Sequence, residues 1–429
     1  MADSAQVRIA LVGAGGMSFG PVMSYDVIRS EKLEGSTLVL VDFDEEKLEV
    51  ARAATERLNE ACGSRINVEA ETDTARGVEG ADFVIVSAEK NRWAGWKQDY
   101  EVPVKYGSAQ DMGENGGPGG LFHSLRSINN MLDICRLVEQ NAGDAFLMNL
   151  TNPMSRVTLA INRATSLRNV GLCHEFFGGH LRLALFLMKP MERVLAKASG
   201  INHFTWFYEI TDAETGEDLY PALRRAVKYF PFPHSKLIRK CFNEFGLYPT
   251  STDSHIGEYL PPEYHDGQPF VKYHDFFRTE GELRFHLTRY YGDGILPFPA
   301  RLLPRSWEEV IPILEALATG DEAARFNAVN VPNSGYVPNL PEGAIVEVSS
   351  GVEGNSLCPD TVPEIHESLA GLMRTQIEIQ DRIVDSALKK DPDLAFEALV
   401  MDPLSPTESD CRKIFDELMD LQRYHLPFE

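Results

Sequence analysis

The sequence predicts an α/β protein that combines a Rossmann-like, doubly wound parallel sheet with a second α+β domain. Short apolar runs, typical of strands buried on both faces, alternate with segments of helical periodicity in the first part of the chain. A glycine-rich turn follows the first apolar run, and an acidic residue ends the second. At 429 residues the chain is long enough for two domains with substantial cores.

The first element is a strand at residues 8–12 that leads directly into a glycine-rich turn. Gly13 and Gly15 allow a tight turn and the close approach of a pyrophosphate, with Gly16 beside them. Ser18 takes the third position of the fingerprint, where Gly or Ala is usual, and the following helix directs its N–H groups at the phosphates. The pattern predicts a dinucleotide-binding turn, and the simpler alternative is an ordinary tight turn.

The second element is a strand at residues 37–41 that ends at Asp42. A carboxylate there can accept hydrogen bonds from the ribose hydroxyls and repels a 2′-phosphate, so the sequence predicts NAD as the cofactor rather than NADP. Residues 44–60 follow with helical periodicity and an acidic first turn. Further strands are predicted at residues 82–86 and 145–148.

Polar residues follow the later strands at the edge where doubly wound sheets bind ligands. Arg92 follows the strand at 82–86, where it either grips a substrate oxygen or is a solvated loop residue. The glycine-rich segment 111–120 suits a backbone close to a ligand, with a helix from about Leu121, or else a mobile surface loop. Pro153 disfavours a helical conformation at Asn152, which places that amide in a strand-to-helix turn.

Cys173 ends a further predicted strand, and His203 lies thirty positions later. A thiolate and an imidazole are good ligands for a borderline divalent ion, and both residues follow a nucleotide-binding pattern. The hypothesis is that the two side chains hold one metal beside a nicotinamide ring. The alternative is a small buried cysteine and a structural histidine.

Composition and charge exclude some functions. Lys and Arg number 41 against 64 Asp and Glu, for a net charge of −23, which argues against nucleic-acid and membrane partners. No apolar run approaches the roughly 18 residues needed to cross a bilayer, and the N-terminus has no signal-like segment. We therefore expect a cytoplasmic protein whose six scattered cysteines are reduced.

Five motifs occur in an order and spacing that resemble glycoside hydrolase family 4, the NAD- and manganese-dependent glycosidases. They are Gly-Ala-Gly-Gly at residues 13–16, Thr-Asn-Pro at 151–153, Gly-Leu-Cys-His at 171–174, Gly-Ile-Asn-His-Phe-Thr-Trp at 200–206 and Asp-Ser-His-Ile-Gly-Glu-Tyr-Leu-Pro at 253–261. The resemblance covers residues 8 to about 360. It implies that Cys173 and His203 bind the metal, Mn²⁺ or another divalent cation.

The resemblance also implies catalytic roles. Asn152 matches a residue that touches the sugar, and His174 stands where the family often places its proton donor. The base falls on Asp253 or Tyr259, and we favour Asp253. The alternatives are a turn or capping role for Asp253 and core packing for Tyr259.

The chemistry implied by the resemblance is an exception to two-carboxylate glycosidases. NAD⁺ removes hydride from C3 of the sugar, which acidifies the C2 hydrogen, and the metal stabilises the developing enediolate. The base takes the C2 proton, the glycosidic oxygen leaves, water adds and the hydride returns to C3. The substrate is a small carbohydrate, an α-glycoside that is either a uronide (galacturonide or glucuronide) or a neutral hexoside. Arg284 and Arg289 either pair with a uronide carboxylate or are solvated helix residues.

The remaining segments predict structure rather than chemistry. Helices are predicted at 308–316, at 364–388 and in the last 40 residues, a strand at 346–348 and a connector at 332–341. We assign residues 1–195 to the NAD-binding domain. We assign 196–429 to an α+β domain that binds substrate, completes the metal site and forms a homodimer or homotetramer.

Two other functions fit parts of the pattern. An NAD-dependent dehydrogenase of a small hydroxy acid or sugar would use His174 as acid and base and need no metal. A catalytically inert NAD-sensing regulatory protein would bind the dinucleotide but tolerate the loss of Cys173.

Overall fold

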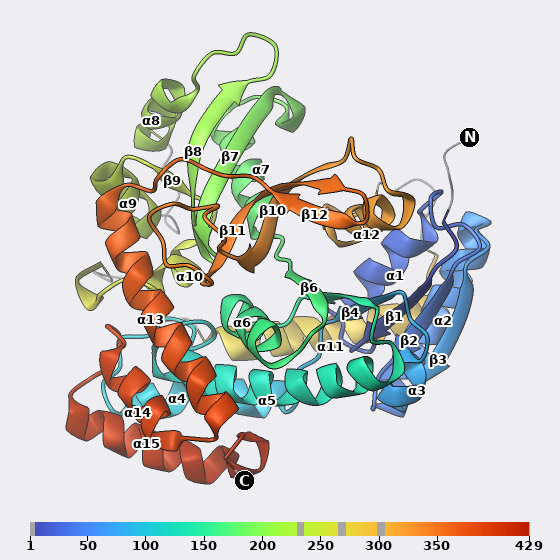
Figure 1. Ribbon diagram of the computed structural model, residues 1–429, viewed down its shortest axis with the longest axis horizontal. Coiled ribbons are helices and arrows are strands. Elements are labelled where there is room, and N and C mark those ends of the chain that lie inside the picture. The colour runs from blue at the N-terminus through green and yellow to red at the C-terminus, as the bar shows by residue number, and fades with distance from the viewer. Residues whose placement is uncertain (1–4, 230–235, 265–271, 298–304, 429) are drawn as a thin grey trace.

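A single mixed sheet runs through the protein, as Figure 1 shows for the computed structural model, which describes residues 5–229, 236–264, 272–297 and 305–428. The N-terminal strands are parallel and lie in the order β3-β2-β1-β4-β5-β6, which is the Rossmann order. The strands are β1 (Arg8–Val12), β2 (Thr37–Val41), β3 (Asn67–Glu71), β4 (Phe83–Val86), β5 (Phe146–Asn149) and β6 (Arg168–Gly171). The predicted fold class is confirmed, although β3 was not predicted.

Alternate residues of β1 pack into cores on opposite faces of the sheet. Ile9 and Leu11 belong to one buried apolar cluster, whereas Ala10 and Val12 belong to the other. Side chains of a strand alternate between the two faces, so a strand covered on both sides must be apolar throughout. This explains the continuous apolar run in the sequence.

Helices cover both faces of this parallel sheet. Apolar residues of α1 and α2 pack into the cluster on one face, and those of α3, α5 and α6 pack into the cluster on the other. The helices are α1 (Gly20–Ile28), α2 (Glu45–Cys62), α3 (Thr74–Val78), α4 (Arg92–Lys105), α5 (Gly117–Asn141), α6 (Met154–Ala164) and α7 (Glu175–Leu187). Asp44 caps α2 by accepting a hydrogen bond from the Lys47 N–H, as its acidic start predicted.

The second part of the chain extends the same sheet with antiparallel strands. The order continues from β6 through β10, β11, β7 and β8 to β9, and β12 pairs with β11. The strands are β7 (Val194–Ile201), β8 (Phe204–Asp212), β9 (Tyr248–Pro249), β10 (Arg325–Pro332), β11 (Ile345–Glu353) and β12 (Ser356–Pro359). The two parts meet where Asn330 of β10 pairs with Gly171 of β6.

The later helices pack partly on these antiparallel strands and partly on the first part of the chain. They are α8 (Tyr220–Tyr229), α9 (Lys236–Phe245), α10 (Asp253–Gly257), α11 (Tyr273–Gly292), α12 (Val310–Thr319), α13 (Glu367–Lys389), α14 (Pro392–Met401) and α15 (Glu408–Gln422). Helix α11 contacts α2 and α4, and α14 and α15 contact α5 and α4. Figure 1 shows α13 running from the antiparallel strands to α5. Leu369 and Met373 pack in the cluster shared with the second part, whereas Ile379 and Ile383 pack against the first.

The glycine-rich segment is irregular over residues 111–116, as predicted, but it is buried, and α5 begins at Gly117 rather than near Leu121. Residues 112–128 are buried. A Cβ atom on Gly116 would lie 1.8 Å from the Glu258 carbonyl oxygen. The glycines are therefore required by tight packing within the protein.

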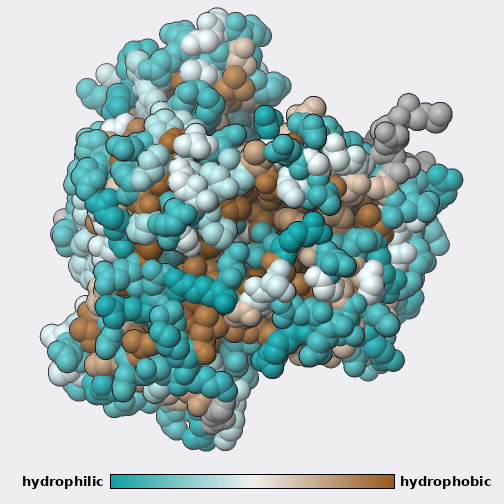
Figure 2. All heavy atoms as spheres, in the orientation of Figure 1, coloured by the Kyte–Doolittle hydropathy of each residue, from teal (hydrophilic) through white to brown (hydrophobic). Residues whose placement is uncertain are grey.

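The visible surface agrees with the acidic composition. Figure 2 shows a face covered mostly by hydrophilic residues, with apolar residues gathered toward its centre and lower part. Among the described residues, no helix combines the length and apolarity that a bilayer crossing requires.

Candidate active site

The glycine turn after β1 leaves no room for side chains. Gly13 has a φ of 91°, and a Cβ atom there would lie 2.1 Å from the Ser87 carbonyl oxygen. The Gly15 N–H donates a hydrogen bond to Asp42 Oδ2 at 2.9 Å. The turn and the acid at the end of β2 are thus in direct contact, and burial raises the pKa of Asp42.

The residues after the turn differ from the predicted fingerprint. Gly16 and Ser18 are exposed, and α1 begins only at Gly20. A Cβ atom on Gly20 would lie 2.1 Å from the Ala14 carbonyl oxygen, so Gly20 provides the close packing expected of Ser18. No side chain caps the N-terminus of α1, but its Gly20 N–H donates to the Gly16 carbonyl oxygen at 2.9 Å, and Pro21 has no N–H.

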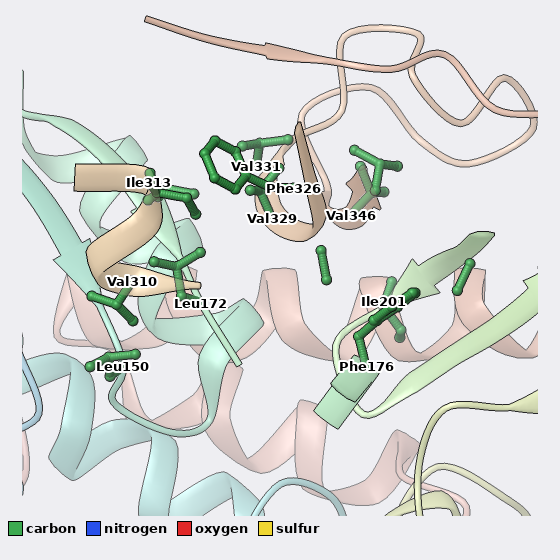
Figure 3. Packing of buried hydrophobic residues seen from close by; sticks show 14 of the residues in the cluster. Leu150, Leu172, Phe176, Ile201, Val310, Ile313, Phe326, Val329, Val331 and Val346 are labelled. Carbon is green, nitrogen blue, oxygen red and sulfur yellow. The ribbon is translucent and has the colours of Figure 1, made fainter. Parts of the chain in front are cut away.

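The structure brings Cys173 and His203 together as predicted. Cys173 lies two residues beyond β6, and His203 occupies the two-residue turn between β7 and β8 with a φ of 63°. Cys173 Sγ lies 3.4 Å from His203 Nε2. The preceding Leu172 and the nearby Ile201 are buried in the same apolar cluster, which fixes both segments (Figure 3).

A buried carboxylate anchors the turn that carries His203. Glu347 Oε2 accepts hydrogen bonds from the side-chain amides of Asn202 (2.9 Å) and Asn330 (3.0 Å). Asn330 is also the residue that pairs with Gly171 at the end of β6. This contact therefore links the segments that present Cys173 and His203. Burial raises the pKa of Glu347.

Two further potential ligands, Glu175 and His255, were not predicted from the sequence. Donor atoms of Glu175, His203 and His255 all lie within 4.8 Å of one another. The ring centroids of His203 and His255 are 4.4 Å apart. Both residues lie in or beside the sequence motifs, but their convergence is a tertiary contact that no spacing reveals.

The site is poorly solvated, and this controls its charges. Burial raises the pKa of the Cys173 thiol well above its usual value, with Glu175 and Glu347 adding to the effect. Burial lowers the pKa of His203 to about 4, so its imidazole is neutral and able to coordinate a metal. A thiolate at Cys173 requires a nearby positive charge, which a divalent ion supplies.

His174 lies at the opening of the site rather than inside it. Its side chain is 61% exposed, and Nδ1 lies 3.4 Å from Glu308 Oε1. Its ring is 6.0 Å from that of Phe19, which precedes α1 in the dinucleotide turn. The predicted proton donor is therefore close to both the metal ligands and the glycine turn, and Glu308 is a contact that the sequence did not predict.

The two candidate bases, Asp253 and Tyr259, have different surroundings. The Asp253 carboxylate accepts hydrogen bonds from the N–H groups of Leu237 (3.2 Å) and Ile238 (3.0 Å) in the first turn of α9. Tyr259 is buried and its ring stacks on Phe204 at 5.6 Å. Burial raises the pKa of Tyr259, and the Arg156 guanidinium acts in the opposite direction. Which of the two residues acts as the base remains a prediction.

Arg92 and Asn152 lie at the carboxyl edge of the parallel strands, as predicted. Arg92 begins α4, pairs with Glu89 and lies 3.7 Å from Glu114. Asn152 is partly buried in the turn between β5 and α6. The substrate roles of both residues remain predictions.

Arg284 and Arg289 lie on α11, and both form ion pairs within the chain. Arg284 pairs with Glu280 on the same face of α11 at 2.7 Å. Arg289 pairs with Glu46 of α2, across the contact between these two helices. Each guanidinium has an acidic partner within the chain, and its role toward a substrate carboxylate remains a prediction.

Comparison with known proteins identifies relatives over the whole chain. The model of family 4 glycosyl hydrolases matches residues 8–189, and that of the family 4 C-terminal domain matches residues 198–405. An α-glucosidase of Erwinia rhapontici is 31% identical, with 96% of both chains covered. An α-galactosidase of Bacillus subtilis (strain 168) is 29% identical, covering 97% of this chain and 98% of that one.

The fold also matches solved structures. A 6-phospho-α-glucosidase from gut microorganisms, in complex with NAD and Mn²⁺, superposes with a TM-score of 0.87 at 21% identity. The match covers 98% of this chain and 99% of the other.

Proposed function

The chain belongs to the family 4 glycosyl hydrolases, and from this premise we propose that it hydrolyses a neutral α-hexoside with NAD and a divalent metal, Mn²⁺ in the first instance, as cofactors. The observation that supports the proposal most strongly is the 3.4 Å approach of Cys173 Sγ to His203 Nε2. This pair lies at the same edge of the sheet as the glycine turn after β1.

The residues present fit both cofactors. The turn at Gly13 suits a pyrophosphate, and Asp42 ends β2 where a ribose is bound in this fold. Cys173 and His203 offer the sulfur and nitrogen donors that a borderline divalent ion prefers. When bound, NAD accepts hydride from C3 of the sugar and the metal polarises the sugar oxygens.

Two side chains carry out the two proton transfers of the reaction, one from C2 of the sugar and one to the leaving oxygen. Tyr259 is assigned the removal of the C2 proton because the motif places it there and it is buried; burial raises its pKa, and the Arg156 guanidinium only partly opposes this. His174 gives a proton to the leaving glycosidic oxygen from the opening of the site, where an aglycone can reach it. Asn152 and Arg92 hold the sugar hydroxyl groups.

A neutral sugar is favoured over a uronide because the candidate arginines are already engaged. Arg284 and Arg289 pair with acidic residues on α11 and α2, and Arg92 pairs with Glu89. The donor set that a substrate carboxylate needs is therefore not offered by these side chains.

We also propose a homodimer or homotetramer in the cytoplasm. Helix α11 has only His274 buried along its length, while Phe276, Leu283, Leu287 and Tyr290 are exposed on it. A second copy of this chain would cover that surface. The six cysteines are free, as a reducing compartment keeps them. We assign NAD binding to the domain of residues 1–195. We assign substrate binding and the completion of the metal site to the domain of residues 196–429.

One assay tests the proposed function. We expect p-nitrophenyl α-glucoside or α-galactoside to be cleaved with NAD⁺ and Mn²⁺, and the corresponding uronide and 6-phosphoglycoside to be cleaved at least about tenfold more slowly. NADH should not accumulate, because the hydride returns to the sugar. Stoichiometric NADH would indicate a dehydrogenase, and binding of NAD without turnover of any sugar would indicate a sensor.

A further inference from the structure

We propose that Glu175 and His255 bind the same metal ion as Cys173 and His203, so that the protein itself supplies four donor atoms. The inference rests on the proposed function, because it requires a metal at Cys173 and His203. It adds two side chains from different elements, the first residue of α7 and the middle of α10.

The first argument is the convergence of the donor atoms. One ligand atom from each of Glu175, His203 and His255 lies within 4.8 Å of the others. Cys173 lies outside this group of three but beside it, since its Sγ is 3.4 Å from His203 Nε2. Ligands of a single ion bonded at about 2.0–2.3 Å lie close to one another, so a small contraction around an ion would complete the set.

The second argument is that buried polar atoms in this cluster lack hydrogen-bond partners. His203 Nδ1, His255 Nδ1 and Glu175 Oε2 are all buried without one in the described part of the chain. A buried polar atom left unpaired costs about 1–3 kcal/mol, so such a group of atoms at one place requires an explanation. An ion held by His203 Nε2 beside Cys173 cannot also bind Nδ1 of the same ring, so the argument rests on Glu175 Oε2 and His255 Nδ1, both of which that ion would satisfy.

The third argument is that Glu175 is held in position by a neighbour. Ser251 donates a hydrogen bond from Oγ to Glu175 Oε1 at 2.5 Å, which leaves Oε2 directed elsewhere. Metal-binding carboxylates are commonly oriented by such outer hydrogen bonds. The carboxylate is only 9% exposed, so solvent does not compete for it.

The consequence is that the metal remains bound when no sugar is present. Two protein donors alone would leave most of the coordination to substrate and water. Four donors of mixed sulfur, nitrogen and oxygen type suit Mn²⁺, Co²⁺ or Zn²⁺ without help from the substrate. Affinity for the metal should then be similar with and without the sugar.

Titration of the metal-free full-length protein with Mn²⁺, followed by electron paramagnetic resonance, tests the assignment. We expect Glu175→Gln and His255→Asn each to raise the Kd for Mn²⁺ at least about tenfold, since removing even an outer contact of a ligand costs about 10–100-fold. The matched controls, Glu192→Gln and His286→Asn, change exposed residues and should leave the Kd unchanged. Unchanged affinity in both Glu175→Gln and His255→Asn overturns the inference.

The same titration separates this inference from the proposed function. Cys173→Ser and His203→Asn must weaken Mn²⁺ binding if the proposed function is correct. If they do so while Glu175→Gln and His255→Asn do not, the function stands and the two added ligands are wrong. If none of the four variants affects binding, the metal site itself is wrong.

X-ray absorption of the Co²⁺-loaded wild-type protein gives a result that does not depend on any variant folding. We expect scattering from two imidazole rings, one sulfur and at least one carboxylate oxygen around the ion. A single imidazole would exclude His255 as a ligand and overturn the inference for that residue.

Discussion

Glu347 Oε2 accepts a hydrogen bond from the side-chain amide of Asn202 at 2.9 Å, directly before the metal-ligand candidate His203. The same oxygen accepts from Asn330, so one buried carboxylate holds the β7–β8 turn against the strand that pairs with β6. The position of the His203 imidazole therefore depends on Glu347 of the central strand β11 as well as on the turn that carries it.

Replacing this carboxylate should loosen the metal site. Glu347→Ala leaves the amides of Asn202 and Asn330 without their acceptor, and each unsatisfied group costs about 1–3 kcal/mol. We expect a lower free energy of unfolding and about 10–100-fold weaker Mn²⁺ binding, measured by denaturant titration and metal titration. Glu347→Gln keeps one acceptor oxygen and should lose less of both; equal losses in the two variants would contradict the anchoring role.

Chelation should abolish activity reversibly. A metal chelator removes the ion that stabilises the Cys173 thiolate, whose pKa is raised by burial, so glycoside cleavage should fall to background and return on addition of Mn²⁺. The measurement is the rate of p-nitrophenol release before and after each addition. Full activity in the chelator would remove the metal from the reaction.

The two candidate bases should respond differently to substitution. Tyr259→Phe should lower kcat by about 10²–10⁴-fold, because the proton acceptor for C2 is lost, and should slow exchange of a C2 deuterium with solvent. Asp253→Ala should cost about 1 kcal/mol of stability through lost contacts with the first turn of α9 and change kcat little. The reverse pattern would restore Asp253 as the base.

Glu258 should make stability depend on pH. Burial raises its pKa to about 8, with Glu114 adding to the effect and hydrogen bonds from Glu114 and Asn115 opposing it. The folded state then binds more protons than the unfolded state between about pH 4.5 and 8, so stability is greatest at the acid end of this window and falls as the pH rises through it. In Glu258→Gln the fall in Tm over this range should be shallower. A parallel decline in both proteins would assign it to other groups.

The surface arginines of α11 should be dispensable for a neutral sugar. Arg284→Ala removes an exposed pair with Glu280, which is worth about 0.3–0.5 kcal/mol at most. We expect kcat/KM for a neutral α-hexoside to stay within about twofold of wild type. A selective loss toward a uronide would instead support the clamp that the sequence suggested.

The parallel sheet and the glycine turn were predictable because they depend on local patterns. Residues 8–12 and 37–41 are apolar throughout, and only a strand covered on both faces requires that. The meeting of Cys173 with His203 was suggested by their motifs as a set. Cys173 follows a strand of the Rossmann-like sheet, whose end is placed by topology, whereas His203 lies in a turn of the antiparallel part and was placed by its motif.

The remaining parts of the site could not be predicted because they depend on tertiary packing. Ser251 orients Glu175 from 76 positions away, and Asp253 serves α9 although the chain places it after that helix. The glycines near Gly116 resembled a ligand-binding loop in the sequence. Glycine is needed wherever the backbone is closely approached, whether by a ligand or, as here, by the Glu258 backbone.

Helix α13 makes the two parts of the chain depend on each other for stability. Its first half packs with Leu369 and Met373 among the antiparallel strands, and its second half packs with Ile379 and Ile383 on the nucleotide-fold side. Unfolding of α13 would expose apolar residues of both buried clusters at the same time. The enzyme should therefore denature in a single cooperative transition, and a fragment cut near residue 195 would expose an uncovered, aggregation-prone surface.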